Sequence, residues 1–166
     1  MRNLVALPVL FLLVIVQTAL LSRLSLFSGT ADIILVWLAG WSLQKPVDSG
    51  IHWALLAAGI MGFVSHIPIL VVVVGYLAVV WMAKLFSRRV WQAPLLAMFG
   101  VTLLGTSVAH AATLTALALA GTVLPLGRSI SFVTLPSVIL NLLLAIPVFY
   151  LCRDLASWVY PGMEAV

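Results

Sequence analysis

The sequence has very little charge. Only 7% of its 166 residues are charged, with eight basic and four acidic side chains, whereas soluble domains carry about 25%. Hydrophobic residues make up 64% of the chain, and the mean hydropathy is +1.28. A soluble fold could not bury this much apolar surface, so the composition predicts an integral membrane protein. Its few basic residues then report membrane orientation, not nucleic-acid binding.

Residues that carry catalysis or bind metals are also scarce. The single cysteine, Cys152, excludes an internal disulfide and a cysteine-cluster metal site. None of the three histidines stands at helix spacing from another histidine, so the zinc-protease motif is missing. The chain also has no nucleophile elbow, no phosphate loop and no pair of intramembrane acids. The sequence therefore predicts a protein that is not an enzyme and needs no metal or cofactor.

The apolar segments predict an all-α membrane protein, with about six transmembrane helices in one compact domain over 1–166. The expected helices cover 4–21, 31–44, 51–65, 69–86, 94–120 and 133–151. The first is interpreted as an uncleaved helix, because no small-residue cleavage site follows it. The second and third are too short for a hydrocarbon core of ~30 Å. Either the membrane thins around them, or they form a hairpin packed mostly against protein.

The basic residues predict that both termini are cytoplasmic. With the N-terminus inside, two basic residues lie outside, Arg23 and Arg128, and the other six lie in the cytoplasm: Arg2, Lys45, Lys84, Arg88, Arg89 and Arg153. Topology and lipid headgroups explain the dense group Lys84, Arg88 and Arg89, and a cytoplasmic protein contact is the alternative. Five tryptophans also fall at the expected cytoplasmic helix ends, as rings at a membrane interface do: Trp41, Trp53, Trp81, Trp91 and Trp158.

The last expected helix carries an asparagine in its apolar centre. An unpaired amide in hydrocarbon costs roughly 2 kcal/mol or more, so Asn141 should face protein or a wet cavity. Its partners are expected on the inward faces of the first and fifth helices, around Gln17 and from Thr106 to His110. Pro136 and Pro147 are expected near the membrane boundaries, where they can shape the helix ends.

Six polar residues are candidates for an inward pocket or for packing between helices: Gln17, Asp32, Thr102, Thr106, His110 and Asn141. Asp32 suits the N-cap of the second helix, where a carboxylate accepts from free backbone N–H groups. His110 has three open interpretations, namely packing against a neighbouring helix, lining a pocket, or relaying protons.

Small residues recur every four positions in the third expected helix, at Gly50, Ala54, Ala58 and Gly62. This pattern lets two helix backbones approach closely. Contact within the chain is the simplest interpretation, and a partner's transmembrane helix could use the same geometry. Further candidates for a helix–helix or partner interface are Gly105, Ala109 and Ser137.

Short motifs spread along the chain are similar to those of the MreD family of bacterial rod-shape proteins. They are Gln17-Thr18, Ala31-Asp32 before an aliphatic run, Gly59-Ile60 with Ser65-His66-Ile67-Pro68, Arg88-Arg89, and Leu135-Pro136 with Asn141 and the segment 145–150. Two positions depart from the family pattern. Ala31 stands where proline is usual, and Gly62 stands where an acidic residue is frequent.

The resemblance implies a non-enzymatic scaffold of cell-wall elongation in the bacterial cytoplasmic membrane. Such a scaffold binds MreC and supports the complex of the RodA glycan polymerase with its class B penicillin-binding transpeptidase. The resemblance also implies a contact with MreB on the cytoplasmic side. The family motif would include Pro136, Asn141 and Pro147. The MreD family is also similar in fold to the substrate-binding subunits of energy-coupling-factor vitamin transporters. The alternative is therefore a small-molecule-binding membrane subunit, with Gln17, His110 and Asn141 around a pocket.

Overall fold

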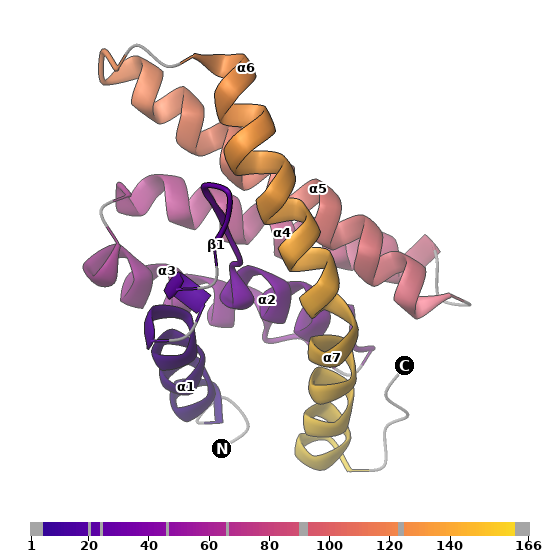
Figure 1. Cartoon of the computed structure of the whole chain (residues 1–166). Coiled ribbons are helices and arrows are strands. Elements are labelled where there is room, and N and C mark those ends of the chain that lie inside the picture. Colours follow the sequence, from indigo (N-terminus) through magenta and orange to yellow (C-terminus); the bar gives the residue numbers. More distant parts are fainter. Residues whose placement is uncertain are drawn as a thin grey trace.

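The computed structural model describes residues 5–19, 21–23, 25–45, 47–65, 67–89, 93–122 and 125–161. Five helices precede a long C-terminal one (Figure 1): α1 (Ala6–Ala19), α2 (Ile33–Leu43), α3 (Gly50–Val64), α4 (Ile69–Arg89) and α5 (Pro94–Leu119). Between α1 and α2 lie a helical turn, η2 (Leu21–Arg23), and a small hairpin of β1 (Ser25–Leu26) and β2 (Gly29–Thr30). The hairpin turns at Phe27 and Ser28.

The C-terminal helix is much longer than the predicted 133–151. It runs for 34 residues through α6 (Leu126–Ser129), the π-helical η3 (Ile130–Thr134) and α7 (Leu135–Val159). Its C-terminal part continues because Cys152 and Ala156 extend the buried face beyond position 150. Pro147 lies inside α7, so the prediction that it shapes a helix end is wrong. Pro136 lies in the first turn of α7, where the π-helical η3 passes into α-helix.

Three helical segments are long and apolar enough to cross a membrane: Ile69–Arg88, Pro94–Leu119 and Leu126–Val159. The helices α1, α2 and α3 are also apolar, but they have only 14, 11 and 15 residues. At helical rise, the shortest of them reaches only about 16 Å. These lengths and compositions are those of a helical membrane protein, as the sequence predicts.

The short helix α2 lies in the middle of the protein, with α4, α5 and α7 packed around it. Every residue from Ile34 to Leu43 is buried. A helix that is apolar on all sides has no face suited to water, so it must be enclosed. Of the two alternatives for the short helices, α2 follows the one in which protein surrounds it. By contrast, α3 keeps an exposed outer face that includes Leu55 and Phe63, the latter 93% exposed.

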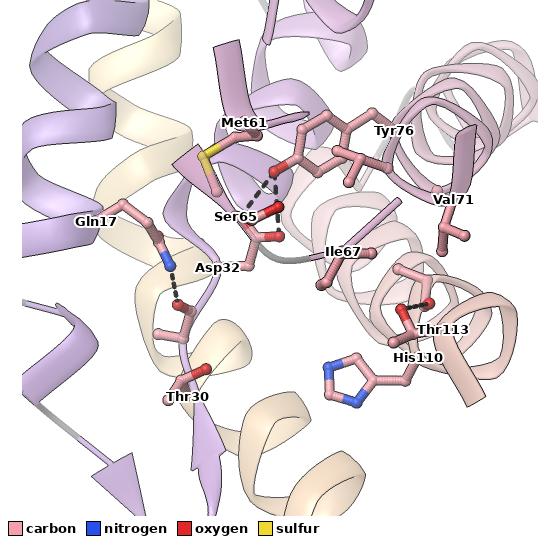
Figure 2. Close-up of a pocket in the computed structure, with 14 residues that line it drawn as sticks. Gln17, Thr30, Asp32, Met61, Ser65, Ile67, Val71, Tyr76, His110 and Thr113 are labelled. Carbon is pink, nitrogen blue, oxygen red and sulfur yellow. Dashed lines mark hydrogen bonds between the residues drawn. The ribbon is translucent and has the colours of Figure 1, made fainter. Parts of the chain in front are cut away.

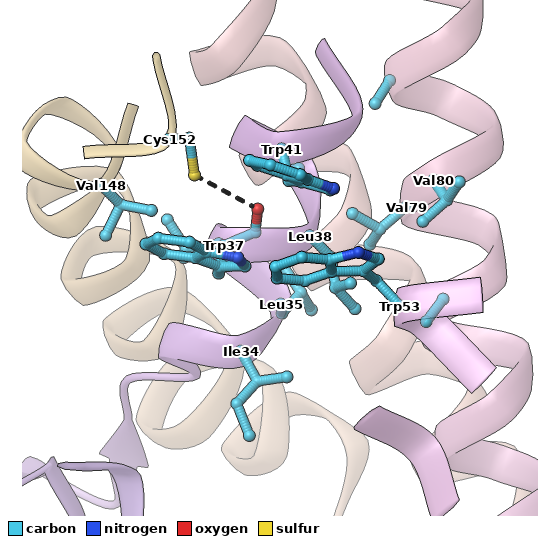
Figure 3. Close-up of a cluster of buried hydrophobic side chains, with 14 of the residues drawn as sticks. Ile34, Leu35, Trp37, Leu38, Trp41, Trp53, Val79, Val80, Val148 and Cys152 are labelled. Atoms are coloured by element: carbon cyan, nitrogen blue, oxygen red, sulfur yellow. Dashed lines mark hydrogen bonds between the residues drawn. The ribbon is translucent and has the colours of Figure 1, made fainter. Parts of the chain in front are cut away.

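Three tryptophans meet towards the C-terminal end of α2, and we call Trp37, Trp41 and Trp53 the tryptophan cluster (Figure 3). The rings of Trp41 and Trp53 stack with centroids 4.5 Å apart, and each residue is only 1% exposed. The prediction that these two rings lie at the membrane interface is therefore wrong, because they fill the core. Trp81 and Trp158 are exposed, at 67% and 72%, and Trp91 lies outside the described residues.

The small residues of α3 face the interior of the chain. Ala54 and Ala58 are fully buried, so they cannot form a partner interface, and that part of the prediction is wrong. A Cβ on Gly62 would meet the side chain of Ile69 at 2.7 Å. The other small residues are also used internally, in contacts of Gly50 with Ser42, of Gly105 with Val79, and of Ala109 with Gly75.

Candidate functional site

The extended segment that leads from the hairpin into α2 lies along the face of the C-terminal helix. Three of its backbone N–H groups donate to that helix, and we call this set of contacts the hairpin junction. The bonds are Ser28 N to Phe132 O at 3.1 Å, Thr30 N to Ser137 Oγ at 3.0 Å, and Asp32 N to Asn141 Oδ1 at 2.7 Å. Alternate N–H groups of an extended chain point the same way, about 6.6 Å apart. The three acceptor residues stand five and four positions apart in the helix, which is about 7.5 Å and 6.0 Å at helical rise, so the donor and acceptor spacings are similar.

Two residues next to these bonds make the close approach possible. Proline has no N–H, so Pro136 cannot donate to the carbonyl of Phe132 four residues earlier. That carbonyl accepts from Ser28 instead. A Cβ on Gly29 would lie 2.7 Å from both Ser137 N and Val133 O, which are backbone atoms of the helix. The sequence prediction of Ser137 as a helix–helix contact is thus replaced by a contact with the hairpin.

Gln17 holds the same segment from the side of α1. Its Nε2 donates to Ala31 O at 2.7 Å, and its Oε1 accepts from Ile33 N at 2.9 Å. A single amide thereby satisfies a backbone acceptor and a backbone donor just before α2 begins. Gln17 and Asn141 therefore act on neighbouring stretches of one backbone and not on each other.

Asn141 has the buried partner that the sequence predicts for it. Its Nδ2 donates to Thr106 Oγ1 at 2.9 Å, while its Oδ1 accepts from Asp32 N. Both Asn141 and Thr106 are only 1% exposed. Thr102, one turn away on α5, is also buried, but its Oγ1 has no hydrogen-bond partner among the described residues.

Asp32 is the N-cap of α2, as predicted, and its Oδ1 accepts from Leu35 N at 3.0 Å. The hydroxyl of Tyr76 lies 3.4 Å from Oδ2 and 3.5 Å from Oδ1, longer than the usual 2.7–2.8 Å for such bonds. Sequence reasoning missed Tyr76. Its one available signal was that it interrupts a run of aliphatic residues from Val71 to Val80.

A cavity of about 200 Å³ lies beside the hairpin junction (Figure 2). Gln17, Asp32, Tyr76 and His110 line it, so His110 takes the pocket-lining alternative among its three interpretations. The other predicted residues, Thr102, Thr106 and Asn141, are absent from its wall. His66 lies outside the described residues.

Outside this cavity, the structure offers little metal chemistry. In the part of the chain that it describes, no three His, Cys, Asp or Glu residues come together as a metal site. The basic residues Lys84 and Arg88 lie at the C-terminal end of α4, with Arg88 exposed. The side chain of Arg89 and all of Arg2 lie outside the described residues.

Comparison with protein-family models, with curated proteins and with solved structures gives no match. The resemblance to the MreD family therefore rests on the motif residues themselves. In the structure, Gln17, Asp32, Pro136 and Asn141 gather around the hairpin junction, although Asp32 and Asn141 are 109 positions apart. Short motifs that are far apart in the sequence thus meet at one place.

Proposed function

We propose that the protein is a non-enzymatic scaffold of bacterial cell-wall elongation, of the MreD type. In this role it lies in the cytoplasmic membrane, binds the single-span protein MreC, and supports the RodA polymerase with its class B penicillin-binding transpeptidase. MreB is the expected contact on the cytoplasmic side. Two observations support this proposal, namely the resemblance of the sequence motifs to the MreD family and the contacts that the motif residues make in the fold.

The observation that carries this proposal is the way the polar motif residues are used. The Gln17 amide bonds the backbone at Ala31 and Ile33, and the Asn141 amide bonds Asp32 N and Thr106. These two amides are thus occupied in joining α1, the hairpin, α5 and α7. This arrangement is expected of a rigid platform, because buried amides with satisfied hydrogen bonds specify one packing of the helices.

The proposal includes six membrane crossings with both termini in the cytoplasm. Among the described basic residues, Lys45 follows α2, Lys84 and Arg88 lie in the C-terminal part of α4, and Arg153 lies in the C-terminal part of α7, whereas Arg23 follows α1 and Arg128 follows α5. With alternating helix directions, these two sets fall on opposite sides, and the larger set marks the cytoplasm. A reporter enzyme fused after the last residue should be active only on the cytoplasmic side. Activity on the outer side would reverse the orientation.

The scaffold role can be tested by capturing partners from native membranes. Three exposed leucines report on three separate helices: Leu12 on α1 at 61% exposure, Leu55 on α3 at 48% and Leu143 on α7 at 68%. Each is replaced by tryptophan in a tagged protein, since a bulky ring is tolerated against lipid but not inside a helix–helix contact. The expected result is that the wild type retains a single-span partner and that one of the three variants loses it.

Each variant is checked by its thermal unfolding and by size-exclusion chromatography, so that a lost partner is not confused with a lost fold. Ala58 is unsuitable for this purpose because it is fully buried. If the wild type retains no single-span protein and no component of the cell-wall synthesis machinery, the scaffold proposal is wrong. Turnover of a lipid-linked substrate by the purified protein would also contradict it.

A further inference from the structure

We infer that the cavity beside the hairpin junction binds a compact organic amine, with its ammonium group on Asp32 and its apolar body in the bundle. The site has contributions from many parts of the fold, with Gln17 from α1, Asp32 from the α2 cap, Tyr76 from α4 and His110 from α5. Figure 2 shows these side chains arranged around one space. The inference does not depend on the scaffold role, because a scaffold can also hold a ligand.

The volume limits the size of the ligand. At about 200 Å³, the cavity is smaller than the pockets of ~300–1,000 Å³ that hold drug-sized molecules. It is larger than an apolar cavity of ~150 Å³ that holds benzene. In proportion, it accommodates a molecule of about eight non-hydrogen atoms. A single ring or a short branched chain with one polar group fits this limit.

The charge of the cavity wall indicates which polar group the ligand carries. Among the described residues that line the cavity, Asp32 is the only acid, and neither lysine nor arginine is present. An unpaired carboxylate in a membrane protein is costly, and a cation beside it removes that cost. An anionic ligand would meet like charge from Asp32. The site therefore favours an ammonium group over a carboxylate or phosphate.

Hydrogen-bond capacity at the carboxylate is incomplete. A carboxylate can accept about four hydrogen bonds. Three donors act on it: Leu35 N at a normal length to Oδ1, Ile34 N, and the Tyr76 hydroxyl, which stands off at 3.4–3.5 Å from the two oxygens. Ser65 also lines the cavity, and its buried Oγ has no hydrogen-bond partner among the described residues. An ammonium group has three N–H donors, which suit acceptors of this kind.

Much of the remaining wall is apolar. Met61 from α3, Ile67 from the following turn, and Val71 and Val72 from α4 line it. Apolar side chains of this type take the hydrocarbon part of a ligand. The combination of one acid with several apolar side chains in one wall is what distinguishes an amine with a hydrocarbon body from a free metal ion or a sugar.

The test uses the full-length protein in lipid nanodiscs and three probes of similar shape, namely benzylamine, benzyl alcohol and benzoate. Binding is measured by isothermal titration calorimetry, and the heat with empty nanodiscs is subtracted to remove partition into lipid. Benzylamine is expected to bind at least about tenfold more tightly than benzyl alcohol, because a hydrogen bond to a charged group is the stronger kind. Benzoate is expected not to bind. Alcohol binding as tight as the amine, or no amine binding, overturns the inference.

Two variants locate the site. Asp32→Asn keeps an N-cap residue of equal quality but removes the charge, so amine affinity should fall about tenfold while alcohol affinity stays within about twofold. Ser107→Ala is the matched control, since Ser107 is outside the lining of the cavity and donates only to Leu103 O within its own helix. Unchanged amine binding in Asp32→Asn overturns the site.

A third variant keeps the result decisive if Asp32→Asn does not fold. Val71→Phe fills the apolar wall from α4 and leaves the hairpin junction in place. It should abolish binding of both benzylamine and benzyl alcohol, and its unfolding temperature shows whether the fold is intact. Amine binding that survives in a folded Val71→Phe protein overturns the location. Failure of these tests leaves the partner-capture result untouched, so the two proposals are judged separately.

Discussion

The two ends of α2 are held by different means. At its N-terminal end, the hairpin junction consists of directed hydrogen bonds, and the amides of Gln17 and Asn141 each donate one bond and accept one. At its C-terminal end, the tryptophan cluster is held by shape. There the Nε1 atoms of Trp37 and Trp53 have no hydrogen-bond partner among the described residues, and the one bond of Trp41 Nε1, to Ser49, is 3.4 Å long.

This difference shows how the fold divides two tasks. Hydrogen bonds are directional, so the hairpin junction fixes the register of an extended segment against a helix. Stacked rings and close-packed aliphatic groups are less directional, and they fill volume around a helix that is apolar on every side. Substitutions at the hairpin junction are therefore expected to disturb the register of the extended segment, and substitutions in the tryptophan cluster are expected to lower the packing density.

The largest effect is expected from removing a ring of the tryptophan cluster. Trp53→Ala deletes a side chain that is 1% exposed and stacked on Trp41. The cavity left behind should lower the free energy of unfolding by about 3 kcal/mol. The measurement is equilibrium unfolding in mixed micelles. Trp81→Ala is the control, since this ring is 67% exposed, and equal losses in the two variants would contradict a core role for Trp53.

The next largest effect is expected at the hairpin junction. Asn141→Leu removes the acceptor of Asp32 N and the donor to Thr106. Two buried hydrogen bonds are lost together, so the free energy of unfolding should fall by about 2 kcal/mol. Ile139→Leu, on the exposed face of the same helix, should have almost no effect. A stability equal to that of the wild type would show that the hydrogen bonds of Asn141 are not needed.

A smaller loss is expected when the hairpin is pushed away from the helix. Gly29→Ala places a methyl group 2.7 Å from backbone atoms of the C-terminal helix, and such overpacking costs about 1–2 kcal/mol. Gly59→Ala is the matched control because a Cβ there meets nothing within 4 Å. That change in a helix interior should be neutral or stabilising by up to about 1 kcal/mol. The two variants are compared by thermal unfolding. Equal unfolding temperatures would contradict the close approach of Gly29 to the C-terminal helix.

Two serines give the smallest and most direct comparison of the two ends. Ser137→Ala removes the acceptor of Thr30 N and should cost about 1 kcal/mol. Ser42→Ala, near the tryptophan cluster, removes a buried hydroxyl that has no hydrogen-bond partner among the described residues, so it should cost close to nothing. Amide hydrogen exchange at Thr30 should rise only in the first variant. If Ser42→Ala lowers the free energy of unfolding more than Ser137→Ala does, the assignment of hydrogen bonding to the N-terminal end of α2 and of packing to its C-terminal end is wrong.

The sequence predicts best where a polar residue stands alone in an apolar helix. The partner of Asn141 on α5 followed from that rule, and the N-cap role of Asp32 followed from the preference of carboxylates for helix N-termini. Both are present in the structure. The N–H groups of Ser28 and Thr30 were not predictable, because every residue except proline has the same backbone donor. Their pairing with the last helix depends on the register of segments more than 100 positions apart.

Other misses have equally specific causes. Tryptophans near helix ends suit both a membrane interface and a core, and only packing decides between them, as for Trp41. Gly127 and its polar neighbours resemble a loop, yet the helix already begins at Leu126. The cavity depends on Tyr76, whose hydroxyl reaches Asp32 across 44 positions. No local sequence pattern predicts such a contact.

The hairpin junction also determines the order in which the protein can be completed. The acceptors for Thr30 N and Asp32 N lie 107 and 109 positions later in the chain. At synthesis rates of about 5–20 residues per second, they emerge roughly 5–20 s after the hairpin. Until then, the start of α2 is held by the nearby Gln17 and, once α4 has been made, by the contact of Tyr76 with Asp32. The first loop of the protein therefore closes last, when the final helix arrives beside it.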